Sequence, residues 1–113
     1  MREESNNFGR QRIHANCWVD WDRQGIWRDR HFIALPFRTF RILAYLMQHS
    51  ERVVTQDELS AIGWGESRTI WDLQAHIHRI RTAIEPDPRH PRWLVTRRGG
   101  GYLLHTDRLS QHA

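Results

Sequence analysis

The sequence predicts an α+β fold in which an N-terminal antiparallel sheet precedes three helices and a C-terminal β-hairpin. Residues 12–35 are rich in aromatic and β-branched side chains broken by turn formers, which is typical of short strands. Apolar residues then recur at steps of three and four in two long segments, as on one face of a helix. Near the end, three glycines separate two β-prone stretches. This order of elements predicts a winged helix-turn-helix.

The first elements are expected to form a small antiparallel meander. The segment "RIHANCWVDW" predicts one strand, "DRQG" a turn, and "IWR" and "HFIAL" two further short strands. Because such a sheet is unstable alone, its apolar face must pack on the rest of the domain. We place this domain at residues 11–106, between a flexible tail at 1–10 and a frayed C-terminus at 107–113.

Three helices are expected to follow. The first spans Pro36–Gln48, because its leading proline suits the first helical position and apolar residues then repeat at helical spacing. The second begins after Thr55, since Thr55 and Glu58 have the spacing of a capping box. Gly63 is expected to end it in a left-handed conformation. The third spans about residues 68–84 and stops at "EPDP", because proline cannot continue a helix.

One face of the third helix carries basic and short side chains. At 100° per residue, Ile77 marks the centre of the apolar stripe, and Arg79 lies about 160° away. Ala75 and Thr82 lie beside Arg79, whereas Arg81 is nearer the edge of the core. Such a ridge fits a DNA major groove, where arginine donates two hydrogen bonds to guanine. A solvated helix face without a ligand is the alternative.

The charge of the chain favours a polyanionic partner. Its 17 basic residues are all arginine, and they give a formal charge of +4 against 13 acidic residues. Arginine binds phosphate or guanine through a planar fork, although GC-rich codon usage would produce the same bias. The hairpin "WLVTRRGGGYLLH" places two arginines beside three glycines, where the backbone can approach phosphate or a minor groove.

Other classes of site do not fit the spacing of the residues. His76 and His78 project about 200° apart on a helix, whereas a chelating pair needs a spacing of four. The single Cys17 is expected to be a small packed residue. We therefore predict no metal, no cofactor and no enzymatic activity. A single cysteine cannot form an intramolecular disulfide, so the reducing cytoplasm is the expected location. No apolar run approaches the length of a membrane span, so no membrane partner is expected.

Four segments together resemble the motifs of one known family. The segment "HIHRIRTAIEPDP" resembles H-I-x-R-L-R-x-K-L-E-P, and "LVTRRGGGY" resembles I-x-T-V-R-G-x-G-Y. The segment "ERVVTQDEL" resembles R-V-V-S-R-E-E-L, and "GWG" resembles V-W-G. The family is the OmpR/PhoB-type winged helix-turn-helix DNA-binding domain of the response regulators of bacterial two-component systems. The resemblance covers about residues 35–104, and the preceding strands fit its N-terminal sheet.

The resemblance implies sequence-specific binding of double-stranded DNA by a transcription regulator. It implies a third helix in the major groove and a hairpin wing on the backbone or minor groove. Taken with the basic hairpin, it points to His76, His78, Arg79, Arg81, Thr96, Arg97, Arg98 and Gly99 as the DNA-contacting residues. It also implies a dimer on DNA, and contact between RNA polymerase and the loop near Gly63–Ser67. No receiver domain is present in the sequence, so an excised effector domain and a stand-alone DNA binder both fit.

The chain departs from the family pattern at several positions. Pro36, Thr39 and Gln56 stand where the family has Thr, Glu and Arg, and Trp71 and Asp72 stand where it has Arg-Thr. A protein-docking module is the alternative function, because the chain has six tryptophans and tryptophan is enriched at interfaces. A small hydrolase or nuclease that uses the histidines is a third hypothesis.

Overall fold

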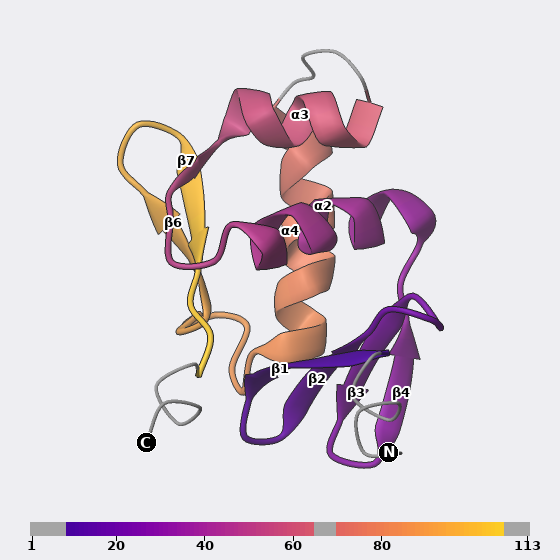
Figure 1. Ribbon diagram of the computed structural model, residues 1–113. Helices are drawn as coiled ribbons and strands as arrows, with labels where there is room; N and C mark the ends of the chain where they lie inside the picture. The colour runs from indigo at the N-terminus through magenta and orange to yellow at the C-terminus, as the bar shows by residue number, and fades with distance from the viewer. Residues whose placement is uncertain (1–8, 65–69, 108–113) are drawn as a thin grey trace.

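A four-stranded antiparallel sheet, three helices and a three-stranded sheet follow one another in the computed structural model, which describes residues 9–64 and 70–107 (Figure 1). The elements are β1 (Arg10–His14), β2 (Cys17–Asp20), β3 (Gly25–Arg28), β4 (His31–Ala34), α2 (Phe37–Gln48), β5 (Val54–Thr55), α3 (Gln56–Trp64), α4 (Ile70–Ile84), β6 (Leu94–Arg97) and β7 (Gly101–Leu104). The predicted winged helix-turn-helix with an N-terminal sheet is confirmed. No helix in the described part of the chain combines the length and apolar character needed to cross a membrane.

The N-terminal sheet has the strand order β1-β2-β3-β4. The prediction of one strand in "RIHANCWVDW" is wrong, because Ala15 and Asn16 form a turn that pairs β1 with β2. That turn contains no glycine or proline, and a single asparagine, Asn16, is only a weak turn signal. Strand β1 begins at Arg10, inside the predicted tail of residues 1–10. Residues 1–8 of that tail lie outside the described residues.

Two helix ends differ from the prediction. Helix α2 begins at Phe37, because Pro36 has a non-helical ψ of 151° and serves as the N-cap residue. Helix α3 continues through Gly63 to Trp64 instead of ending in a left-handed glycine. Side chains of α2 satisfy the carbonyl groups there, since Arg38 Nε donates to the Gly63 oxygen at 2.8 Å and Arg41 Nε to the Ile62 oxygen at 3.2 Å. A left-handed cap is therefore not needed to satisfy them.

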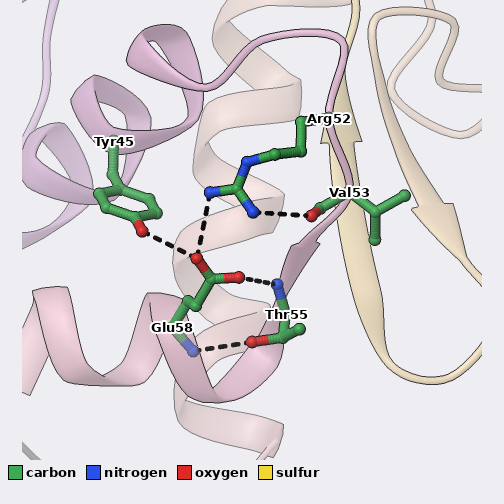
Figure 2. A network of polar contacts seen from close by, with 5 residues as sticks. All are labelled: Tyr45, Arg52, Val53, Thr55 and Glu58. Atoms are coloured by element: carbon green, nitrogen blue, oxygen red, sulfur yellow. Dashed lines mark hydrogen bonds and ion pairs between the residues drawn. The ribbon is translucent and has the colours of Figure 1, made fainter.

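The predicted capping box is confirmed at the start of α3. The amide of Glu58 donates to Thr55 Oγ1 and the amide of Thr55 donates to Glu58 Oε1, both at 3.0 Å. Figure 2 shows that the Glu58 carboxylate also accepts hydrogen bonds from Tyr45 Oη at 2.8 Å and Arg52 Nη2 at 3.1 Å. The Thr55 amide, then Tyr45 and Arg52, lower the pKa of Glu58 to about 2.

The C-terminal sheet has one strand more than the predicted hairpin. Its order is β5-β7-β6, and the additional strand is β5, which lies between α2 and α3 in the chain and pairs with β7. We call residues 94–104, which comprise β6, the turn and β7, the wing. Gly99 and Gly100 adopt left-handed φ angles of 88° and 84° in its turn, which glycine does without strain. The amide of Gln56 donates to the Gly100 oxygen at 3.1 Å, so the wing turn is also held by the first residue of α3.

One core joins the helices to both sheets. The predicted apolar stripe of α4 is buried at Leu73, Ile77, Ile80 and Ile84. Fully buried aliphatic residues of the other elements belong to the same core, including Ile13, Val19, Ile26, Ile42, Leu43, Leu46, Val54, Leu59, Leu94 and Leu104. In Figure 1, α4 runs from beside α3 to the N-terminal sheet, and the wing lies along one side of it. The helix is therefore positioned by both sheets.

Asp107 lies in the predicted frayed segment of residues 107–113 but is bonded to the N-terminal sheet. Asp107 was placed in the frayed segment, but its amide donates to the Ile13 oxygen at 2.6 Å, and its carboxylate pairs with Arg12 Nη2 at 2.7 Å. These bonds tie Asp107 to β1. Residues 108–113 lie outside the described residues.

Candidate nucleic-acid interface

Two hollows border the outward face of α4. The first, of about 230 Å³, lies between α4 and the wing, and the second, of about 410 Å³, lies between α4 and the end of β4. The lining of the first includes Gln56, Gln74, His78, Arg81, Thr96 and Gly100. The second includes Leu35, Pro36, His78, Arg79 and Thr82. The structure thus brings predicted site residues of the helix and of the hairpin together around one hollow.

Arg79 and His78 are exposed between these hollows. Both side chains are on the side of α4 that faces away from its buried stripe, and neighbouring Ala75 and Thr82 are also exposed. The short side chains beside Arg79 leave its guanidinium as the longest group on that ridge. This arrangement would allow α4 to approach a flat or grooved surface closely, with Arg79 foremost.

Arg81 and Thr96 are bonded to each other. Arg81 Nε donates to the Leu94 oxygen at 2.9 Å, and its Nη2 donates to Thr96 Oγ1 at 3.0 Å. The Arg81 guanidinium also lies 6.0 Å from the centroid of the Tyr102 ring. Burial lowers the pKa of Arg81 from its ordinary value. Two of the predicted DNA contacts therefore join α4 to the wing within the protein.

His76 is half-buried and faces α2. Its Nδ1 shares a hydrogen bond of 2.7 Å with the hydroxyl of Thr39, which is fully buried. The ring of Trp64 lies edge-on, with centroids 5.4 Å apart. Burial, followed by the positive charges of Arg79 and Arg38, lowers the pKa of His76, although Asp72 opposes the shift. The neutral imidazole is therefore favoured, and its hydrogen-bonding partner is Thr39, one of the positions at which this chain departs from the family pattern.

The wing presents its basic residues at the end away from the core. Arg97 ends β6, and Arg98 and Gly99 follow in the turn, all three exposed. A Cβ built on Gly99 would have no neighbouring atom within 4 Å, so the tip is surrounded by open space. Backbone and guanidinium groups at this tip can both approach a polyanion.

Three polar residues near the interface were not selected from the sequence. Gln56 and Gln74 line the hollow beside the wing, and the position of Gln74 one turn before His78 was the available signal. Glu85 is fully buried, and its carboxylate accepts hydrogen bonds from three amides, with the shortest at 2.7 Å from Leu94. The sequence motif "EP" indicated the end of the third helix, but it did not indicate which amides would donate hydrogen bonds to Glu85.

No metal or thiol chemistry is indicated in the part of the chain that the structure describes. Within residues 9–64 and 70–107, no group of three or more His, Cys, Asp or Glu is placed to hold a metal ion. Cys17 is buried, and burial raises the pKa of its thiol to about 12. The loop expected to contact RNA polymerase, near Gly63–Ser67, lies mostly outside the described residues.

Comparison with known proteins identifies the family. Residues 29–104 match the family model described as "Transcriptional regulatory protein, C terminal". The chain belongs to this family. Its sequence is 38% identical over 91 residues to the sensory transduction protein RegX3 of Mycobacterium leprae, covering 76% of this chain and 44% of RegX3.

Comparison with solved structures shows that this chain resembles OmpR/PhoB-type domains. The response regulator DrrB of Thermotoga maritima, an OmpR/PhoB homolog, aligns with a TM-score of 0.76 and 29% identity, over 91% of this chain and 47% of DrrB. The DNA-binding domain of Klebsiella pneumoniae RstA, solved in complex with the RstA box, aligns with a TM-score of 0.72 and 19% identity, over 85% of this chain and 96% of that domain. The resemblance found in the sequence is confirmed. The chain spans less than half the length of RegX3 and DrrB.

Proposed function

We propose that this domain binds double-stranded DNA sequence-specifically as part of a bacterial transcription regulator. The observation that carries the proposal is the hollow that α4 and the wing line together, with exposed arginines on both elements. Helix α4 would act as the recognition helix in the major groove, and the wing would contact the backbone or the neighbouring minor groove. The family match and the DNA complex of the RstA domain support this use of the fold.

Arg79 is the main base-contacting residue in this proposal. It is the exposed arginine at the centre of the α4 ridge, and an arginine there can donate two hydrogen bonds to guanine O6 and N7. His78, on the same face, would contact a base edge or phosphate. Arg97, Arg98 and Gly99 would contact the sugar-phosphate backbone, where charge matters more than base identity.

The proposal extends to the partners and setting that the family resemblance implies. Pairing of two domains on DNA and a contact with RNA polymerase near Gly63–Ser67 are proposed on that basis. A cytoplasmic location and the absence of catalytic activity follow from the same role. Residues 11–106 are proposed to be the DNA-binding unit, since the core, the wing and all of β1 except Arg10 lie inside this range.

Substitution of Arg79 tests the helix assignment. Arg79→Ala should weaken binding to the cognate site by about 1–3 kcal/mol and relax the base preference at one position, because a bidentate base contact is lost. The cognate site would first be selected from a random pool of duplex DNA, and affinities then measured by gel shift. Arg89→Ala is a matched control, since Arg89 is an exposed arginine between α4 and β6.

Two results would count against the proposal. Selection that enriches no motif would favour the protein-docking hypothesis, as would binding that is insensitive to salt, because DNA affinity falls steeply with salt through counterion release. Equal effects of Arg79→Ala and Arg89→Ala at an enriched site would show that α4 does not contact bases in the proposed orientation.

A further inference from the structure

The wing is attached to the end of α4 by three side-chain hydrogen bonds. Glu85, one residue after α4, accepts from the Leu94 amide at 2.7 Å. Arg81, one turn earlier, donates to the Leu94 oxygen at 2.9 Å and to Thr96 Oγ1 at 3.0 Å. The amide and the carbonyl of Leu94 therefore each form a hydrogen bond with a side chain at the end of α4. Of these two side chains, Arg81 is the one that also bonds Thr96, two residues further along β6.

The Arg81 contact involves both strands of the wing. Thr96 pairs with Tyr102 across the two strands, and the Arg81 guanidinium lies 6.0 Å from the Tyr102 ring centroid. Strand β6 ends at Arg97, and the exposed Arg98 follows it. The bond at Thr96 is thus one residue from Arg97 and two residues from Arg98, the wing arginines proposed to contact DNA. Loss of this bond would remove one restraint on β6 close to Arg98.

The chemistry of the contact requires arginine rather than a generic cation. A guanidinium offers donors in a rigid planar fork, whereas a lysine ammonium is a compact charge on a flexible stem. Arg81 uses its fork to bond a backbone carbonyl and a hydroxyl at the same time. Its half-buried position directs these donors into the protein, in contrast to the exposed Arg79.

We infer that Arg81 is a positioning residue that fixes the wing against the recognition helix, with Thr96 as its anchor, and is not itself a DNA contact. This inference rests on the proposed DNA-binding function, which it deepens. A wing held in place before binding needs no ordering when DNA arrives. The contribution of Arg98 to DNA affinity therefore depends on Arg81.

Amide hydrogen exchange without DNA tests the attachment directly. Exchange at residues 95–103 should accelerate about fivefold or more in both Arg81→Lys and Arg81→Met, because one or two hydrogen bonds are lost. Thr96→Val should produce a smaller acceleration at the same amides. Protection of α4 should stay at the wild-type level, which also shows that each variant is folded. Unchanged exchange in the wing of Arg81→Lys would overturn the inference.

A double-mutant cycle on DNA separates positioning from direct contact. Arg81→Met and Arg98→Ala should each weaken binding on the order of tenfold, and the double variant should bind no more weakly than the weaker single variant. Arg81→Lys should resemble Arg81→Met, although it keeps the charge. Arg89→Met controls for the loss of one positive charge at an exposed site.

The outcomes are distinct. Multiplied effects in the double variant, or near-normal affinity of Arg81→Lys, would show that Arg81 contacts phosphate itself and would overturn the inference. If the wild-type protein binds no DNA motif, the proposed function fails, and the exchange experiment still decides whether Arg81 holds the wing.

Discussion

Arg79 and Arg81 lie two positions apart on α4, yet their environments differ. Arg79 is exposed, whereas Arg81 is half-buried and bonded to Leu94 and Thr96. The net charge of the chain counts these two arginines alike, although they differ in how freely their N–H donors can bind DNA. The capacity of an arginine to bind DNA depends on whether its N–H donors already form hydrogen bonds within the protein.

Glu58 gives the domain a specific acid sensitivity. Its pKa is lowered from 4.5 to about 2 by the Thr55 amide, then by Tyr45 and Arg52. A lowered carboxylate pKa stabilises the fold above the unfolded value near 4.5, and this stabilisation is lost as pH falls toward 2. We expect Glu58→Ala to lower the free energy of unfolding by about 1 kcal/mol at neutral pH, measured by urea titration. The partly exposed site limits the electrostatic share.

Glu58→Gln is the control for this prediction. Glutamine keeps the capping-box geometry but does not titrate. The stability difference between the wild type and Glu58→Gln should therefore shrink as pH falls from about 4.5 to about 2. A difference that stays constant across this range would contradict the assigned pKa.

Sequence separation determined which residue contacts could be predicted. The capping box joins residues three apart, and helix geometry alone brings such residues together. The contact of His76 with Thr39 spans 37 positions, and that of Arg81 with Thr96 spans 15. These pairs form only once the helices and sheets are packed. Helical spacing did place Arg81 near the core edge, but it could not identify its acceptors.

At the scale of the elements, periodic segments were predicted well and tight turns were not. Helices α2 and α4 carry apolar residues at helical spacing, and their observed ranges agree closely with the predictions where described. The turn at Ala15 and Asn16 has no glycine or proline and was missed. Gly63 was assigned a stop signal, but Arg38 and Arg41 of another helix satisfy the end of α3 instead. Tertiary contacts decided the error at Gly63, whereas the turn at Ala15 and Asn16 was missed because it lacks the strongest turn-forming residues.

Glu85 links two elements and should be among the sensitive residues of the fold. Its buried carboxylate accepts amides of Arg92, Trp93 and Leu94 at the start of β6. We expect Glu85→Ala to lower the free energy of unfolding by about 3 kcal/mol, because the buried Leu94 amide and two part-buried amides are left without an acceptor. Urea titration followed by circular dichroism measures this change.

Glu51→Ala is the matched comparison for Glu85→Ala. Glu51 also accepts a backbone amide, that of Thr106 at 2.9 Å, but it is exposed to solvent. Its loss should cost less than about 1 kcal/mol, since water replaces the carboxylate. If the two variants are equally destabilised, burial of Glu85 is not the reason for its effect.

At the scale of the molecule, the N-terminal sheet meets the C-terminal end of α4 and the segment that leads into the wing. His14 of β1 donates through Nε2 to the Ile84 oxygen at 2.8 Å and stacks on Trp93, with ring centroids 4.8 Å apart. Arg12 and Asp107 add an ion pair between the sheet and the end of the chain. A four-stranded sheet of this size needs such packing to be stable. The sequence predicted that need, but it did not show which residues would meet it.

Because of this arrangement, we expect the domain to unfold as one cooperative unit, and we expect substitutions of His14 to destabilise it. His14→Phe keeps an aromatic ring against Trp93 but leaves the Ile84 oxygen without its donor, so the free energy of unfolding should fall by about 1–2 kcal/mol. His14→Ala removes the stacking as well and should cost about 3 kcal/mol.

Tryptophan fluorescence, which includes Trp18 and Trp27 of the sheet, and far-ultraviolet circular dichroism, which follows the helices, should give coincident transitions in the wild type. Separate transitions in the wild type would show that the sheet unfolds independently, and an unchanged midpoint in His14→Ala would show that His14 does not couple the sheet to α4.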